Sequence, residues 1–244
     1  MTKNFYERIL LMGGPGSGKS TQMLHCISYL QDKGARCHIL DCEDKLIATT
    51  SGMDGKWPVV HVSVFWEDML TSMDILVKEA KPEDWVFVDR VDLSWSEVQR
   101  WYTAARYKKD LGEKLMAASV AMGTKSSMDM PRFDEGAWQT INENYYFWMQ
   151  TLLYRLRCNL VLTAGIRVAE DYDVFGHLKV APRGQKELPH QPHTAILLHQ
   201  TYDKVEKEKK WLMTTGKDLP GRLYYENEPV LDFAIQYLGG VVGI

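Results

Sequence analysis

Residues 13–20 have the sequence Gly13-Gly14-Pro15-Gly16-Ser17-Gly18-Lys19-Ser20, which matches the phosphate-binding loop pattern G-x-x-x-x-G-K-[ST] at every fixed position. The apolar run 9–12 precedes this loop and apolar residues at helical spacing follow it, so the loop lies at a strand-to-helix junction. Its glycines allow successive backbone N–H groups to face one centre, where a helix N-terminus adds positive potential. The segment therefore predicts a nucleoside triphosphate site.

Three side chains that end the loop or follow it have predicted roles in this site. Lys19 is expected to reach the β- and γ-phosphates of ATP, and the hydroxyl of Ser20 is expected to bind Mg²⁺. Thr21, the next helical residue, is a second candidate for phosphate contact. The cofactors expected are thus ATP and Mg²⁺.

The rest of the chain alternates between apolar, strand-like runs and helical patterns. A helix is expected over 19–33 and another over 66–80, and the alternation predicts an α/β fold with a mostly parallel central sheet flanked by helices. We expect one domain over 1–244, a mobile insertion near 108–136 and a long loop near 165–192. The strand-like runs are 37–40, 59–65, 85–88, 160–163 and 195–198, with 211–215 expected to pair with 195–198.

The composition gives information about the cellular compartment and about possible partners, but not about the activity. The net charge of −3 neither supports nor excludes a DNA partner. The four cysteines show no spacing typical of a metal site or a disulfide scaffold, which favours a reducing cytoplasm. No apolar stretch approaches the ~18 residues of a membrane span, so no membrane partner is expected.

Polar residues after the strand-like runs supply the remaining candidates. Asp89 ends the run Trp85-Val86-Phe87-Val88 and is the predicted metal-side acid, with Asp92 as the alternative. Glu43 follows the strand over 36–40 and is a candidate to polarise the attacking water, the alternative being a solvated acidic turn. Thr163 ends the run 159–164 and, with Arg167, is a candidate to sense the γ-phosphate.

In the order of these parts, the chain resembles the RecA-like branch of P-loop ATPases, in particular small recombinase-related NTPases encoded by bacteriophages. The resemblance implies that Glu43 is the catalytic glutamate, and that Lys217 and Arg222 reach into the nucleotide site of a neighbouring subunit. It implies a homo-oligomeric ring or filament, in the host cytoplasm if the protein is phage-encoded. The matching segments are 13–21, 37–43, 85–89, 159–164 and 211–222.

The same resemblance implies DNA, single-stranded rather than double-stranded, as the partner in recombination, annealing or a related transaction. The contacting segments would be 108–136 and 165–192, and the second contains Arg167, Lys179, Arg183 and Lys186 for phosphates, with Tyr172 and Phe175 for stacking on bases. Three alternatives stay open: a small-molecule or nucleotide kinase, a DNA-packaging motor ATPase, and a nucleotide-gated adaptor without hydrolysis. Asp89 is followed by Arg90 rather than by a second acid, which disfavours the packaging motor.

Overall fold

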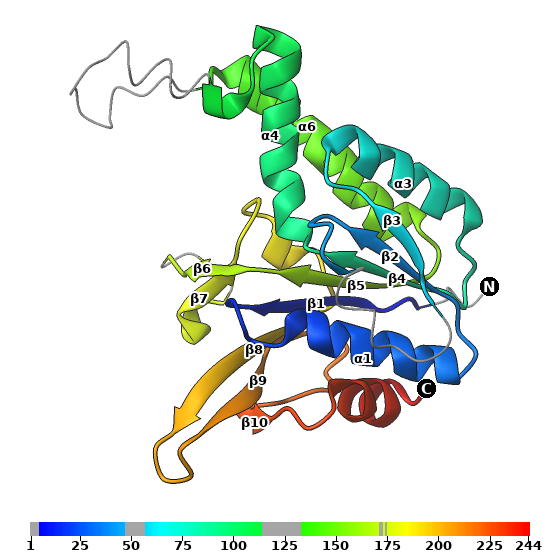
Figure 1. Ribbon diagram of the computed structural model, residues 1–244, viewed down its shortest axis with the longest axis vertical. Coiled ribbons are helices and arrows are strands. Elements are labelled where there is room, and N and C mark those ends of the chain that lie inside the picture. Colours follow the sequence, from blue (N-terminus) through cyan, green and yellow to red (C-terminus); the bar gives the residue numbers. More distant parts are fainter. Residues whose placement is uncertain (1–4, 47–56, 114–132, 171–172, 174) are drawn as a thin grey trace.

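A central sheet of eight strands, in the order β10-β9-β8-β1-β5-β4-β2-β3, organises the computed structural model (Figure 1). The structure describes all residues except 1–4, 47–56, 114–132, 171–172 and 174. The six strands from β8 to β3 are parallel, and β9 and β10 extend the sheet as antiparallel strands. The strands of this sheet are β1 Arg8–Gly13, β2 Cys37–Asp41, β3 Val59–Val62, β4 Trp85–Asp89, β5 Asn159–Ala164, β8 Thr194–Asp203, β9 Glu208–Asp218 and β10 Glu228–Pro229.

Helices cover both faces of the sheet, which explains why its inner strands have apolar residues at nearly every position. One face packs against α1 Lys19–Asp32 and the π-helical segment η5 Ala234–Val242. The other packs against the helices α3 Trp66–Glu79, α4 Val91–Tyr107 and α6 Glu135–Gln150, with the π-helical turn η2 Thr151–Arg155 that continues α6. Alternate residues of each inner strand therefore enter two separate cores.

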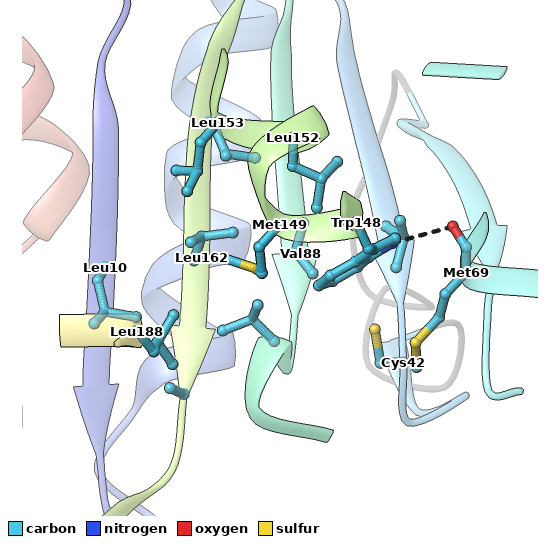
Figure 2. Close-up of a cluster of buried hydrophobic side chains, with 14 of the residues drawn as sticks. Leu10, Cys42, Met69, Val88, Trp148, Met149, Leu152, Leu153, Leu162 and Leu188 are labelled. Atoms are coloured by element: carbon cyan, nitrogen blue, oxygen red, sulfur yellow. Dashed lines mark hydrogen bonds between the residues drawn. The ribbon is translucent and has the colours of Figure 1, made fainter. Parts of the chain in front are cut away.

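The core beneath α3 and α6 is built around Trp148 (Figure 2). Its indole Nε1 donates a hydrogen bond of 3.2 Å to the Met69 carbonyl on α3, so the ring is buried with its polar atom satisfied. Val88 on β4 and Leu162 on β5 lie in the same cluster. This packing fixes the two strands whose ends carry Asp89 and Thr163.

Arg8, at the amino end of β1, is a buried cation that binds carbonyl oxygens at the C-terminal end of η2. Its guanidinium donates to four carbonyl oxygens, at distances from 2.6 to 2.9 Å. Carbonyls at a helix C-terminus carry partial negative charge, so they suit a buried guanidinium. Burial nevertheless lowers the pKa of Arg8 from its ordinary value. These bonds anchor β1, and hence the loop that follows it.

The sequence predictions for the sheet are confirmed, whereas the long loop predicted near 165–192 is wrong in part. That segment contains a two-stranded antiparallel hairpin at the carboxyl edge of the main sheet. Its elements are β6 Ile166–Val168, the 3-10 turn η3 Gly176–Leu178, β7 Val180–Pro182 and the 3-10 turn η4 Leu188–His190. Strands of three residues are too short to show a periodic apolar pattern, so the sequence did not reveal them.

Most of the insertion predicted near 108–136 lies outside the described residues, since 114–132 belong to the part that the structure leaves undescribed. Its boundaries can be compared: α4 ends at Tyr107, and α6 begins at Glu135 with the Asp134 side chain accepting a hydrogen bond from the Ala137 N–H. Across the described residues, no helix has the length and apolar character needed to cross a bilayer.

Candidate nucleotide site

The phosphate loop joins β1 to α1 at the carboxyl edge of the sheet, and three of its four glycines, Gly13, Gly16 and Gly18, are required by its shape. Gly16 and Gly18 have φ of 73° and 88°, in the left-handed region that favours glycine. Gly13 is required by close approach, because a Cβ there would lie 2.3 Å from both the Leu198 carbonyl oxygen and Ser17 Oγ. The residues of the sequence motif are therefore those that this tight loop demands.

Lys19 folds back over the loop. Its Nζ donates hydrogen bonds of 2.9 and 3.0 Å to the carbonyl oxygens of Gly13 and Gly14. The pKa of Lys19 lies below its ordinary value, first because of burial and then because the positive charge of Arg90 is near. A polyanionic ligand at the loop would offset both effects, since it would supply a negative partner to a partly desolvated ammonium group.

Asp89 connects the loop helix to the neighbouring strand. Its Oδ2 accepts a hydrogen bond of 3.2 Å from Ser20 Oγ in the first turn of α1, and its Oδ1 accepts one from Thr163 Oγ1 at the end of β5. These contacts follow from the strand order β1-β5-β4, which brings the three carboxyl ends side by side. Burial raises the pKa of Asp89, although the two hydroxyl donors oppose that rise. A nearby cation would therefore stabilise the charged form of this buried carboxylate.

The residues present fit a Mg²⁺-nucleotide. Ser17 Oγ is buried and has no hydrogen-bond partner among the described residues, and Lys19 Nζ donates to the loop carbonyls of Gly13 and Gly14. Ser20 and Asp89 supply the hydroxyl and carboxylate oxygens that Mg²⁺ prefers. Thr21 is exposed on α1. Among the described residues no group of three or more His, Cys, Asp or Glu side chains is placed to hold a metal ion, so a cation here would depend on phosphate oxygens and water for its other ligands.

Glu43 lies at the same sheet edge, where Arg90 holds it. Arg90 Nη1 donates a hydrogen bond of 2.5 Å to Glu43 Oε1, and Arg90 Nη2 donates one of 2.9 Å to Asp92 Oδ2. Asp92 is buried and engaged in this way, so it does not share the environment of Asp89. The hydrogen bond to Asp92 is the main reason why the pKa of Arg90 is raised. The peptide bond between Asp89 and Arg90 is cis.

Arg90 and Trp211 are two residues of this site that the sequence did not identify. Trp211, on β9, donates from Nε1 to the Gly16 carbonyl oxygen at 3.1 Å. The sequence did contain an indication for Arg90. It directly follows Asp89, so both residues must lie at the same edge of the sheet. Trp211 gave no comparable signal, since it is 195 residues from Gly16 in sequence.

Lys217 and Arg222 lie far from this loop within the chain. Lys217 pairs in register with Ala195, which pairs with Leu10, so it is level with the middle of β1 and not with the Gly13 end that carries the loop. Its Nζ donates to the His190 carbonyl at 2.9 Å. Arg222 donates to both carboxylate oxygens of Glu7, at 2.8 and 3.0 Å. The predicted roles of Lys217 and Arg222 therefore require the site of another subunit and stay predictions.

The aromatic and basic residues expected to contact DNA differ in their surroundings. Phe175 is fully buried in the core, so the expectation that it stacks on bases is wrong. Arg167 is held in a bidentate ion pair with Asp173, both bonds being 2.8 Å long. Lys179, Arg183 and Lys186 are exposed on and beside the β6–β7 hairpin, and Tyr172 lies outside the described residues.

No protein-family model matches the chain, and no curated protein matches it in sequence. Among solved structures, it is similar to the KaiC-like protein PH0186 from the hyperthermophilic archaeon Pyrococcus horikoshii OT3, with a TM-score of 0.50 and 15% identity over 91% of this chain and 83% of that one. It is also similar to the RadB recombinase, with a TM-score of 0.47 and 11% identity over 90% and 84% of the two chains.

The first of these similarities, together with the phosphate loop between β1 and α1 and the parallel strand order, shows that the chain has the RecA-like α/β fold that the sequence predicted. At this level of identity the likeness concerns the fold.

Proposed function

We propose that this chain is a Mg²⁺-dependent ATPase that acts on single-stranded DNA as a homo-oligomer. The observation that supports the ATPase activity is the meeting of Lys19, Ser20, Asp89 and Thr163 around one glycine-rich loop. These residues come from two neighbouring parallel strands, β4 and β5, and from α1, the helix that follows β1. Such a cluster provides a cation for phosphates and a hydroxyl–carboxylate pair for a metal.

Each residue has a distinct task in the proposed reaction. The loop N–H groups and Lys19 bind the phosphates, while Thr163 fixes the orientation of the Asp89 carboxylate through its hydrogen bond. Mg²⁺, held by Ser20 and Asp89, would supply neutralisation of the phosphate charge. Glu43 positions the attacking water and accepts its proton, and Arg90 holds the Glu43 carboxylate at the sheet edge.

The ATPase proposal is tested by phosphate release with Mg²⁺ from wild type, Lys19→Ala and Glu43→Gln. We expect Lys19→Ala to lose both binding and hydrolysis, and Glu43→Gln to keep MgATP binding while hydrolysis falls by roughly 100-fold or more. Lys33→Ala, an exposed lysine at the far end of α1, is the matched control. Tight MgATP binding by wild type without any phosphate release would instead indicate the nucleotide-gated adaptor.

The proposed oligomer is supported by the position of Lys217, whose Nζ donates to the His190 carbonyl and not to the loop of its own chain. If Lys217 completes the site of a neighbour, Lys217→Ala and Glu43→Gln are each inactive alone, but mixed oligomers contain some interfaces with both residues intact. Recovery of phosphate release on mixing is the expected result. Absence of recovery, in subunits shown by light scattering to assemble together, contradicts the role in trans.

The DNA partner is supported by the exposed cations of the β6–β7 hairpin at the carboxyl edge, near the nucleotide site. Lys179 precedes β7 and Arg183 follows it, and Arg183 Nε donates to the Ile166 carbonyl at 2.9 Å, which fixes the hairpin's base. We expect Lys179→Ala and Arg183→Ala each to weaken single-stranded DNA binding and to reduce its salt slope by about 1. Lys207→Ala, at the tip of the β8–β9 hairpin, is the control.

One observation favours the kinase alternative. A pocket of about 400 Å³ lies beside Gly184, close to Asp92, and is lined by Trp95, Trp138, Asn142 and Gln185 among others. A pocket with aromatic walls and amide groups beside a nucleotide site could hold a phosphate acceptor. Transfer of labelled phosphate to a nucleoside or other small acceptor, rather than to water, with no effect of DNA on turnover, would establish this alternative and overturn the proposal.

A further inference from the structure

Trp211 lies directly against the phosphate loop although it belongs to the other end of the chain. Met213 pairs with Leu198, which pairs with Gly13, so Trp211 is two residues beyond the level at which the loop begins. The β8–β9 hairpin extends past this edge of the sheet (Figure 1). Trp211 Nε1 donates the hydrogen bond to the Gly16 carbonyl, and a Cβ added at Gly18 would lie 3.6 Å from Trp211 Cδ1, so the ring also lies close to Gly18.

This contact is made at Gly16 and Gly18, the loop residues whose backbone dihedral angles have the most freedom. Gly16 and Gly18 both have positive φ, and glycine loses more conformational freedom on ordering than any other residue. In a planar trans peptide the carbonyl and the following N–H point in opposite directions. A bond that holds the Gly16 carbonyl outward therefore turns the Ser17 N–H inward, where it donates to the Gly14 carbonyl at 3.2 Å in this structure.

We propose that Trp211 is a positioning residue, which holds the curled conformation of the phosphate loop, closed by the bond from the Ser17 N–H to the Gly14 carbonyl, around the proposed anion site. This inference rests on the proposed nucleotide site and adds to it a residue that touches no phosphate itself. The indole is 43% exposed, so it is not a main support of the core. Its loss should accordingly disturb the loop much more than the stability of the fold.

The variant that isolates the hydrogen bond is Trp211→Phe, which keeps an aromatic ring and removes the N–H. Trp57→Phe is the matched control. Trp57 is exposed and precedes β3, which forms the opposite edge of the sheet from β9 and β10. We expect the Kd for MgATP, measured by calorimetry, to rise roughly tenfold in Trp211→Phe, as the loss of one hydrogen bond suggests. The thermal midpoint and kcat at saturating MgATP should stay near wild type, and Trp57→Phe should match wild type throughout.

A second measurement needs no nucleotide. Hydrogen exchange of the amides over 13–20 should be faster in Trp211→Phe than in wild type or Trp57→Phe, because the loop loses an external restraint. Unchanged exchange together with an unchanged Kd overturns the inference. If wild type has no affinity for MgATP, the proposed function fails, whereas faster exchange in Trp211→Phe would still support the positioning role.

Discussion

Ser20 donates a hydrogen bond from Oγ to Asp89 Oδ2, joining the first turn of α1 to the carboxyl end of β4. The two residues are 69 positions apart in sequence and meet because β5, which separates β1 from β4 in the sheet, ends beside both. Thr163, on that intervening strand, occupies the other oxygen of the same carboxylate. The pair thus places a hydroxyl and a carboxylate oxygen side by side in a fixed geometry.

Removal of the Ser20 hydroxyl should weaken the response to metal. In Ser20→Ala we expect the Mg²⁺ concentration for half-maximal hydrolysis to rise and the maximal rate to fall by about 100-fold or more, because metal neutralisation of phosphate charge contributes several kcal/mol. Phosphate release titrated with Mg²⁺ measures both effects. Ser28→Ala, at an exposed serine further along α1, is the control, and equal losses in the two variants would contradict the metal role of Ser20.

Asp89→Asn should stabilise the protein while it abolishes metal-dependent hydrolysis. Burial raises the pKa of this carboxyl, so in its window of titration the native state binds more protons than the unfolded state, and stability falls as pH rises through that window. At pH 7 the charged group therefore costs free energy that Asn does not, and we expect a gain of about 1 kcal/mol. Urea unfolding at pH 7 and pH 4 measures it. The gain should shrink at the lower pH, and destabilisation at both would contradict the interpretation.

The sequence predicted the sheet and the phosphate loop because both depend on local patterns. The runs that became β2, β4 and β5 are apolar at successive positions, as strands buried on two faces must be, and each polar residue at their carboxyl ends was assigned to the correct edge. The glycine spacing of the loop is likewise local. These features could be predicted without knowledge of any long-range contact.

The features that could not be predicted depend on contacts between distant residues. The ion pair of Arg90 with Glu43 requires the pairing of β2 with β4, and the contact of Trp211 with Gly16 requires the register of β9 on β8. Phe175 was assigned to a loop by its surroundings in sequence, but the β6–β7 hairpin returns it to the core beside Gly216. Aromatic residues within irregular segments can thus be core anchors.

Gly13 and Gly14 are adjacent in sequence and should differ sharply in their tolerance of substitution. A Cβ at Gly13 would meet the Leu198 backbone oxygen, which cannot move without disturbing β8, whereas a Cβ at Gly14 would lie 3.9 Å from the nearest atom, Ile166 Cδ1. We expect Gly13→Ala to cost roughly 1–3 kcal/mol of stability and to abolish MgATP binding. Gly14→Ala should stay within about 0.5 kcal/mol of wild type. Urea unfolding measures both, and similar losses would contradict the close approach at Gly13.

The ion pair between Glu7 and Arg222 should be important for stability, which complicates any test of Arg222 in catalysis. Glu7 is only 4% exposed, so Arg222→Ala leaves a buried carboxylate without its bidentate partner and should cost about 2 kcal/mol. The double variant Glu7→Gln with Arg222→Ala should recover part of that loss, because no charge then remains buried. A fall in phosphate release that persists in the double variant, at restored stability, would support the role of Arg222 across a subunit interface.

His38 should make the protein less stable in mild acid. It is fully buried on β2, its Nε2 lies 3.4 Å from Asp84 Oδ2, and its pKa is lowered mainly by burial and secondarily by Arg36, which outweigh the favourable effect of Asp84. Below the ordinary histidine pKa of about 6.5, the unfolded state therefore binds more protons than the native state, and stability falls as pH falls. Urea unfolding between pH 7.5 and pH 5 should show this decline.

The contribution of His38 to that decline can be separated from those of the other histidines. The pKa of His61, which stacks on His38 with ring centroids 6.1 Å apart, is also lowered by burial, so His61→Gln serves as the matched comparison. We expect His38→Leu to flatten the pH dependence more than His61→Gln does, because the imidazole of His38 is the more deeply buried. An unchanged slope in His38→Leu would mean that His38 is protonated in the native state, paired with Asp84, and that the pair outweighs the cost of burial.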